Sequence, residues 1–192
     1  MNELKKKKKI VEYSKLFSTK KLSPIRSGNI SIRHNMKNTQ GFLISPSGKK
    51  NSELKIEDIV FVSLEGKAHN NKIPSSEWPF HLEIYTKYAV NAVVHAHSKF
   101  AVICSCLYKK IPSFHYMIAV AETTEIKVAK YALFGTKELS KNVSIALKNS
   151  KTCLISNHGQ VSIGSNIDRA FELAEEVELL CEYYYYCRLF KK

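Results

Sequence analysis

Apolar side chains recur at helical spacing in several parts of the chain. Ile10, Tyr13 and Phe17 share one face and predict a helix over residues 3–17. Further helices are expected from Ser75-Ser76-Glu77 onward, over 98–106 and over 137–149. The longest pattern predicts a helix over 168–190, whose apolar stripe consists of Ala170, Leu173, Ala174, Val177, Leu180, Cys181 and Tyr184.

Short strands are predicted where β-branched and aromatic residues stand between turn formers. These strands are expected at 30–33, 41–45, 59–63, 91–97, 127–131 and 153–156. Strands and helices that alternate along a chain indicate a layered α/β domain. No repeat or low-complexity linker divides the sequence, so we expect one domain over residues 1–192.

Composition limits the class of protein. The 192 residues are 44% hydrophobic, which is enough for one buried core and argues against intrinsic disorder. No apolar run reaches the roughly 18 residues that a bilayer span needs, so we expect a soluble chain with no membrane partner. The N-terminal lysine run carries no apolar segment of a secretory signal, and we therefore expect a cytoplasmic protein.

The sequence is strongly basic, with 30 Lys and Arg against 17 Asp and Glu and a formal net charge of +13. Only Arg26, Arg33, Arg169 and Arg188 are arginines, whereas surfaces that grip phosphates or read bases usually depend on the planar guanidinium group. We therefore expect no nucleic-acid partner and interpret the lysines as a solvated surface. The densest cluster, at residues 5–9, is interpreted as the basic start of a helix.

Several other side chains are assigned no chemistry. The cysteines lie in apolar segments without paired spacing, which predicts reduced, buried thiols at Cys104, Cys106, Cys153, Cys181 and Cys187. The glutamates of the predicted helices are interpreted as solvated faces, namely Glu138, Glu172, Glu175, Glu176 and Glu178. The four tyrosines at 183–186 cannot all share one helix face, so some should pack while others reach solvent or a neighbouring subunit.

Two histidines close an apolar strand at a spacing that places both rings on one face. His95-Ala96-His97 could therefore direct two imidazoles at one metal ion. His158 follows another predicted strand, in Asn157-His158-Gly159, where the glycine permits a tight turn. Three neutral imidazoles leave one coordination position open on zinc. Taken alone, the first pair is equally compatible with half-buried histidines that are satisfied by hydrogen bonds.

Three polar turns offer groups that bind anions. Ser75-Ser76-Glu77 stands at a predicted helix N-terminus, where free N–H groups favour a phosphate. On its own, this segment is more simply an ordinary helix cap in which Glu77 complements the helix dipole. Ser27-Gly28-Asn29 and Ser47-Gly48 are likewise interpreted first as turns and second as oxyanion-binding loops.

Six motifs occur in one order along the chain: Ser27-Gly28-Asn29-Ile30-Ser31, Leu43-Ile44-Ser45-Pro46-Ser47-Gly48, Pro74-Ser75-Ser76-Glu77-Trp78, His95-Ala96-His97, His115-Tyr116-Met117-Ile118 and Asn157-His158-Gly159. Together they resemble the class II aldolase/adducin family, and within it the aldolases that act on L-fuculose 1-phosphate. The resemblance covers about residues 27–184. Six ordered motifs are far more specific than any one of them.

The resemblance implies a three-layer αβα fold with a central, largely antiparallel sheet. It also implies a zinc-dependent lyase that cleaves a ketose 1-phosphate, such as L-fuculose 1-phosphate, to dihydroxyacetone phosphate and an aldehyde through a metal-stabilised enediolate. By position, His95, His97 and His158 are the ligands of one zinc ion per subunit. The residues expected to bind the substrate phosphate are Gly28, Asn29, Ser47, Gly48, Ser75 and Ser76.

The same resemblance assigns roles to two further residues. Glu77 matches the acid/base of the reaction and can also approach the metal when substrate is absent. Tyr116 matches a tyrosine that an adjacent subunit of a cyclic homotetramer contributes, where it serves the oxygen of the departing aldehyde. The expected partners are thus a phosphorylated sugar and further copies of the chain.

Other members of the family are alternatives. A pentulose-phosphate 4-epimerase typically carries aspartate where Glu77 stands, and a methylthioribulose-phosphate dehydratase typically carries glutamate where Tyr116 stands. A non-catalytic, adducin-like interaction module is expected to have lost the metal-binding histidines, and all three are present here. These differences favour an aldolase.

Overall fold

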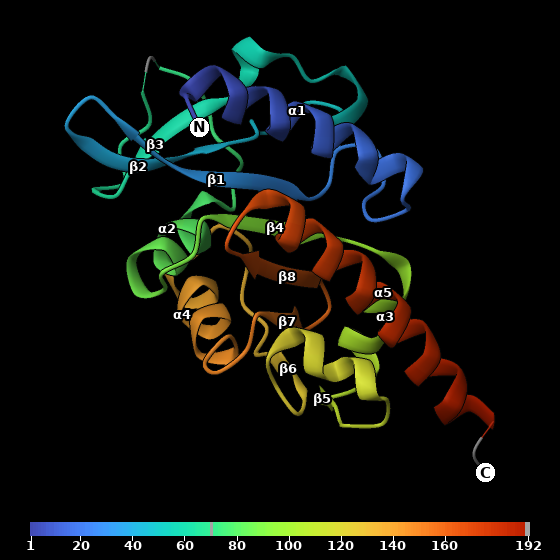
Figure 1. Ribbon diagram of the computed structural model, residues 1–192. Helices are drawn as coiled ribbons and strands as arrows, with labels where there is room; N and C mark the ends of the chain where they lie inside the picture. The colour runs from blue at the N-terminus through green and yellow to red at the C-terminus, as the bar shows by residue number, and fades with distance from the viewer. Residues whose placement is uncertain (70, 191–192) are drawn as a thin grey trace.

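The computed structural model describes residues 1–69 and 71–190, so Asn70, Lys191 and Lys192 of the expected domain 1–192 lie outside the described residues. The strands are β1 (Asn29–Met36), β2 (Thr39–Ile44), β3 (Val60–Ser63), β4 (Ala92–Ala96), β5 (Lys110–Ile111), β6 (Ile126–Ala129), β7 (Thr152–Ile155) and β8 (Gly159–Gly164). Within the described residues these eight strands form one sheet in the order β3-β2-β1-β4-β8-β7-β6-β5 (Figure 1). Only β6 and β7 pair in parallel, which confirms a largely antiparallel sheet.

Helices cover both faces of this sheet and complete the three layers that the resemblance implied (Figure 1). The α-helices are α1 (Glu3–Thr19), α2 (Trp78–Lys87), α3 (Lys99–Leu107), α4 (Lys137–Ala146) and α5 (Ile167–Phe190), and short 3-10 helices span Asn51–Glu53, Ile56–Asp58 and Tyr116–Ala121. Phe80 of α2 and Val143 of α4 bury one face of the sheet. Phe17 of α1, Phe171 of α5 and Cys104 of α3 belong to the clusters on the opposite face. No helix in the described residues is both long and apolar enough to cross a membrane.

The pleat of β4 decides which of its side chains face the functional histidines. Successive strand residues point to opposite faces, so Val94 joins the cluster beneath α1 and α5 while Val93 joins the cluster beneath α2 and α4. His95 follows Val93 by two residues, and its ring lies edge-on to Phe80 of α2 with the centroids 5.3 Å apart. The strand therefore delivers His95 to the α2 side of the sheet.

The predicted helices and strands are present with shifted ends, but β5 and β8 were missed. β8 has the sequence Gly-Gln-Val-Ser-Ile-Gly, in which polar and apolar residues alternate over four positions only, between two glycines that favour a turn. Every residue of β8 is buried, because the polar side chains find partners inside the protein. Gln160, for example, donates from Nε2 to Ser98 Oγ and to the carbonyl oxygen of Ala174.

The cysteines are free thiols, as predicted, but their predicted burial is only partly correct. Cys104, Cys153 and Cys181 are buried, whereas Cys106 and Cys187 are exposed. On α3, Cys106 follows Cys104 by two residues and therefore points to the opposite side of the helix. Cys187 lies in the last turns of α5, which extend beyond the body of the molecule (Figure 1).

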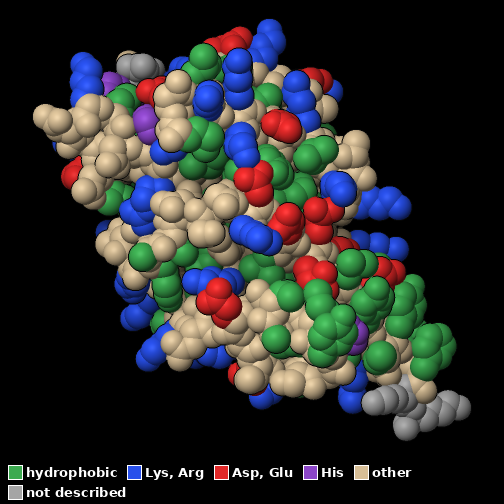
Figure 2. Space-filling view, viewed as in Figure 1, with side chains coloured by type: hydrophobic (Ala, Val, Ile, Leu, Met, Phe, Trp, Pro, Cys, Tyr) green, Lys and Arg blue, Asp and Glu red, His purple; other side chains and the backbone are tan. Residues whose placement is uncertain are grey.

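The basic surface and the tyrosine run agree with the sequence analysis. Lys and Arg side chains are scattered across the face seen in Figure 2, where apolar side chains gather over the C-terminal part of α5. Within the lysine run on α1, Lys6 donates to the carbonyl oxygen of Arg33 and Lys9 pairs with Asp168. Of the tyrosines, Tyr184 packs on Tyr108 and Phe114, while Tyr183 and Tyr186 are exposed.

One glutamate of α5 contradicts its interpretation as a solvated side chain. Glu178 is half-buried, and its two carboxylate oxygens accept hydrogen bonds from the backbone N–H groups of Phe100 and Ala101 at 2.8 and 2.9 Å. These donors belong to the first turn of α3, which has no intrahelical acceptor for them. Glu178 thus caps α3 from a neighbouring helix, and α3 follows directly after His97.

This cap predicts a measurable contribution to stability. Glu178→Ala should lower the free energy of unfolding by about 1–2 kcal/mol, the range for loss of a helix N-cap. The matched control is Glu172→Ala on the same helix, where the exposed ion pair with Arg169 is worth less than about 1 kcal/mol. Urea denaturation of both variants measures the difference, and equal midpoints would show that Glu178 does not cap α3.

Candidate metal centre

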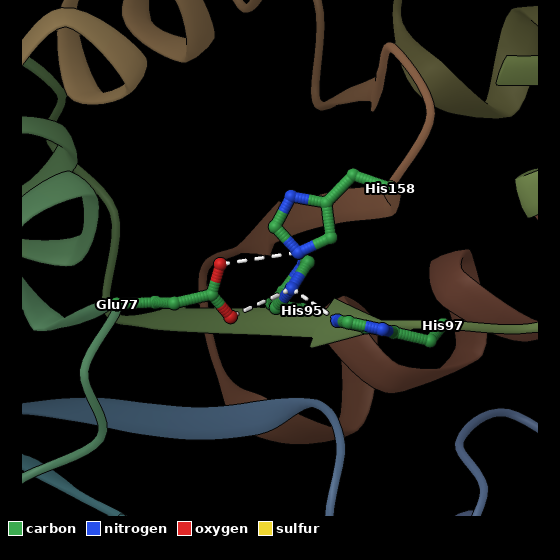
Figure 3. A group of neighbouring side chains, drawn as sticks. All are labelled: Glu77, His95, His97 and His158. Carbon is green, nitrogen blue, oxygen red and sulfur yellow. Dashed lines mark hydrogen bonds and ion pairs between the residues drawn. The ribbon is translucent and has the colours of Figure 1, made fainter. Parts of the chain in front are cut away.

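Four side chains from three separate segments converge at one point of the fold (Figure 3). Glu77 directly precedes α2, His95 and His97 stand at the end of β4, and His158 lies in the turn between β7 and β8. One ligand atom from each of the four lies within 4.8 Å of the others. Sequence segments far apart are therefore brought together at one point.

The orientation of His95 is set from behind its ring. Nδ1 lies 2.8 Å from the carbonyl oxygen of Gln160, an atom that only accepts, so Nδ1 carries a proton. The other nitrogen, Nε2, faces Glu77 Oε2 at 3.0 Å and His97 Nε2 at 2.8 Å. A carbonyl that fixes one nitrogen and directs the other inward is a typical outer contact of metal-binding histidine.

The carboxylate of Glu77 is buried, with 6% of its surface exposed. Burial by itself would raise the pKa of this group, but His95 and His158 outweigh burial and hold the pKa well below its usual range. Oε1 lies 3.2 Å from His158 Nε2 yet receives no directed hydrogen bond from any of the described residues. A buried carboxylate is costly when one of its oxygens, here Oε1, lacks a directed donor, and a nearby cation would compensate this cost.

Burial lowers the pKa of His97 to about 3, and the nearby His95 and His158 add to this effect. His97 is therefore neutral and offers a lone pair. Imidazole nitrogens and a carboxylate oxygen are donors that zinc and related divalent ions prefer. The four residues thus fit a divalent metal ion. The alternative, histidines that are satisfied only by hydrogen bonds, fits less well, because it leaves ring nitrogens and Glu77 Oε1 facing one another.

Close backbone contacts hold the histidine-bearing strands at this distance. A side chain on Gly159 would place its Cβ 2.3 Å from the carbonyl oxygen of Ala96. The glycine is needed for this approach and not for the tight turn expected of it, because the left-handed residue of the turn is Asn157, with φ of 56°. On the other side of β4, a Cβ on Gly28 would lie 2.7 Å from the carbonyl oxygen of His95.

The residues expected to bind phosphate lie on three loops, two of them side by side. Ser47 N donates to the carbonyl oxygen of Ile73 at 3.3 Å, and Ser75 N donates to that of Ser45 at 3.0 Å. The loop before Gly28 is tied to Asn51, which donates from Nδ2 to the carbonyl oxygen of Ser27. Asn29 and Ser75 are buried, Gly28 is half-buried, and Ser47, Gly48 and Ser76 are exposed.

The segment Ser75-Ser76-Glu77 does precede a helix, but the expectation of an ordinary side-chain cap is wrong. No side chain caps α2. Glu77 occupies the cap position with its carboxylate turned toward His95 and His158, so it does not serve the helix N-terminus. Its place beside the histidines explains why a carboxylate stands at this position.

Tyr116 does not belong to this cluster within the described chain. It begins the 3-10 helix Tyr116–Ala121 and is 80% exposed, in contact with the ring of His115. Such exposure of a large aromatic side chain is compatible with a role at another subunit.

A recess of about 730 Å³ reaches His97 and His158 and includes Ile25 and Val102 in its lining.

Two buried polar residues near the cluster were missed by the sequence analysis. Gln160 lies in the unrecognised strand β8, and only the fold reveals its carbonyl behind His95. His81 is fully buried and touches Asn29, which in turn donates to Glu77 Oε2 at 3.1 Å. A signal for His81 existed, because it follows Glu77 by four residues and so lies on the same side of the helix.

Known proteins share this fold and much of this sequence. The model of the Class II Aldolase and Adducin N-terminal domain matches residues 8–185. An L-fuculose phosphate aldolase of Haemophilus influenzae is 40% identical over 185 residues, covering 96% of this chain and 84% of that protein. A 5-methylthioribulose-1-phosphate/5-deoxyribulose-1-phosphate aldolase of Rhodospirillum rubrum is 39% identical over 179 residues, covering 93% of this chain and 79% of that protein.

Comparison with solved structures points to the same family as these relatives. An L-fuculose 1-phosphate aldolase superposes with a TM-score of 0.91 at 34% identity, covering 98% of this chain and 88% of that one. The L-fuculose-1-phosphate aldolase of Thermus thermophilus superposes with a TM-score of 0.84 at 26% identity, covering 95% and 93% of the two chains. The chain therefore belongs to the class II aldolase and adducin family, as an enzyme of its aldehyde-lyase type.

Proposed function

We propose that the protein is a zinc-dependent aldolase that cleaves a ketose 1-phosphate to dihydroxyacetone phosphate and an aldehyde, with residues 1–192 acting as one domain. The convergence of Glu77 with His95, His97 and His158 within 4.8 Å is the observation that carries this proposal. In this proposal, the three histidines hold one zinc ion per chain and leave a coordination position open for substrate. When bound, the ion supplies Lewis-acid stabilisation of negative charge that develops on substrate oxygens.

Glu77 is proposed as the acid/base. Its pKa lies well below the usual range because His95 and His158 outweigh burial, so at neutral pH it starts as a proton acceptor. Oε2 is held by Asn29, whereas Oε1 has no directed hydrogen bond, so Oε1 is the oxygen available to take up a proton and return it.

The phosphate of the substrate is proposed to lie against Gly28, Asn29, Ser47, Gly48, Ser75 and Ser76. The serine hydroxyls and the Asn29 amide are donors suited to a phosphate oxygen. Binding at this end orients the sugar so that the bond to be broken stands over Glu77 and the histidines. The loops thus supply orientation, and the strand ends supply the reacting groups.

The substrate class follows from the reaction and from the relatives. Cleavage of a 2-ketose 1-phosphate between C3 and C4 leaves the same three-carbon product, dihydroxyacetone phosphate, whatever the aldehyde. Relatives at 39% and 40% identity are named for L-fuculose phosphate and for 5-methylthioribulose 1-phosphate or 5-deoxyribulose 1-phosphate. L-Fuculose 1-phosphate is our first candidate, and the 5-substituted ribulose phosphates are the second.

Tyr116 is proposed to act in the site of an adjacent subunit of a cyclic homotetramer. Its 80% exposure and its absence from the cluster of its own chain support this role. In a ring, one repeated heterologous interface lets each subunit donate a tyrosine on one side and receive one on the other. There the phenol would hydrogen-bond the oxygen on C4 and relay its proton to solvent as the aldehyde carbonyl forms.

The metal assignment predicts a stoichiometry. The wild-type protein, dialysed against zinc and freed of excess, should retain one zinc ion per chain by elemental analysis. His95→Ala and His158→Ala should each lose stoichiometric zinc because each removes an imidazole donor. His115→Ala, a histidine outside the cluster, is the control and should retain the metal. Full occupancy in both cluster variants would mean that the ligand set is wrong.

The reaction predicts a product and a sensitive residue. Zinc-loaded protein should release dihydroxyacetone phosphate from L-fuculose 1-phosphate or from a 5-substituted ribulose 1-phosphate, followed with a coupled reductase. Glu77→Gln should keep the fold and the metal but lose on the order of 10² to 10⁴ in turnover, the range for a general acid or base. Glu172→Gln is the matched control. Normal turnover of Glu77→Gln would remove this residue from the mechanism.

A shared site predicts complementation between subunits. Tyr116→Phe and His95→Ala should each be poorly active, whereas a co-assembled mixture should regain activity, because some interfaces combine an intact metal centre with an intact tyrosine. Tyr131→Phe, which alters another exposed tyrosine, serves as the control and should be fully active. A mixture no better than its parents, or a fully active monomer in light scattering, would contradict the shared site.

A further inference from the structure

A chain of buried polar groups runs behind Glu77, and beyond Asn29 the reaction proposed above does not use it. Asn29 Nδ2 donates to Glu77 Oε2 at 3.1 Å, and Asn29 Oδ1 is hydrogen-bonded to His81 Nε2. His81 Nδ1 lies 2.7 Å from Ser31 Oγ, which lies 2.8 Å from Tyr85 Oη. His81 and Ser31 are fully buried and Tyr85 is 2% exposed, so these groups satisfy one another without solvent.

The Glu77 carboxylate at one end fixes the direction of every hydrogen bond in this series of buried polar groups. An ionised carboxylate only accepts, so Asn29 must present its NH₂ group to Glu77 and its oxygen to His81. His81 must then donate from Nε2. Burial lowers the pKa of His81 to about 3, so the ring is neutral and Nδ1 accepts. Ser31 therefore donates to Nδ1 and accepts from Tyr85.

The far end of the chain is anchored to backbone. The guanidinium group of Arg33 lies over the ring of Tyr85, 4.9 Å from its centroid. Arg33 also donates to the carbonyl oxygens of Val90, Tyr85 and Tyr88 at 2.8, 2.7 and 2.9 Å. The phenol is thereby fixed at the C-terminal end of α2. The Tyr85 hydroxyl is a rigid donor at one end, and the Glu77 carboxylate accepts at the other. Only one arrangement of protons therefore satisfies every group between them.

We propose that His81 is a positioning residue, which, backed by Ser31 and Tyr85, holds the Asn29 amide with its NH₂ group toward Glu77. This inference rests on the proposed roles of Glu77 and Asn29. An amide turned the other way would set its oxygen against the carboxylate and against the substrate phosphate. In the observed orientation one N–H holds Glu77 Oε2, the second can donate to an anionic oxygen of the substrate, and Oε1 stays free for proton transfer.

The first test reads the proton arrangement without using activity. Long-range ¹H–¹⁵N correlation spectra of zinc-loaded, histidine-labelled full-length protein report the tautomer of each ring, and the signal lost in His81→Phe assigns His81. The expected form is neutral, with the proton on Nε2 and an unprotonated Nδ1. A proton on Nδ1 would overturn the proposal, because His81 could not then donate to Asn29. This result does not depend on the substrate or on the reaction.

The second test separates positioning from stability. His81→Phe keeps an aromatic ring in the stack with Phe80 but removes both nitrogens. It should lower kcat per folded chain by about 10- to 100-fold, the usual effect of losing an outer contact of a metal or catalytic site. Zinc should stay at one ion per chain. His81→Gln, whose amide offers a donor and an acceptor, should recover most of the loss.

A milder pair of variants keeps the proposal testable if His81→Phe does not fold. Tyr85→Phe removes one hydroxyl from the chain of hydrogen bonds, while Tyr88→Phe removes a hydroxyl that donates to the Ser144 carbonyl oxygen on another path. Tyr85→Phe should lower kcat several-fold relative to Tyr88→Phe at equal zinc content. Equal kcat in these two variants, or wild-type kcat in folded His81→Phe, would refute the positioning role. Absence of aldol cleavage in the wild type would instead refute the proposed function.

Discussion

The carboxylate of Glu77, buried beside three imidazoles, is the constraint on which the rest of the site depends. An uncompensated buried charge costs several kcal/mol, so the folded chain must supply positive charge or directed donors at this point. His95 and His158 face the two carboxylate oxygens at 3.0 and 3.2 Å, and Asn29 donates to one of them. A divalent cation among the same four groups would satisfy both the carboxylate and the lone pairs of the rings. The chemistry of the site and the stability of its apo form thus share one cause.

The architecture explains how such a cluster can be held still. β4 and β8 are adjacent in the sheet, and their neighbouring ends carry His97 and the turn with His158. The glycine at position 159 lets the two backbones approach, and Glu178 fixes the start of the helix that follows His97. Helix α2 closes the site from the third side with Glu77 at its N-cap position. Rigid elements thus carry the reacting groups, whereas the groups proposed to bind phosphate lie on loops.

Local sequence patterns predicted much of this arrangement, and the reasons for the failures are physical. The spacing of His95 and His97 on an apolar strand indicated two rings on one face, His158 in its glycine turn offered a third, and the family resemblance added the role of Glu77. β8 escaped because its alternation is four residues long and stands between two glycines, and the partners that bury Gln160 and Ser162 are visible only in the folded chain. Glu178 was interpreted wrongly for a similar reason. Its carboxylate oxygens accept hydrogen bonds from the first turn of α3, which lies about 80 residues earlier in the chain. Periodicity reports which face of an element is apolar, but only tertiary contacts show which polar groups are satisfied inside.

The proposed chemistry requires that the four converging side chains hold a metal ion. X-ray absorption at the zinc edge of the stoichiometrically loaded protein measures this directly. We predict a shell of nitrogen and oxygen donors at about 2.0–2.2 Å with the scattering pattern of three imidazoles, reduced by one imidazole in any His97→Ala protein that still retains zinc. Sulfur donors at about 2.3 Å, or a shell of water oxygens without imidazole scattering, would contradict the assignment.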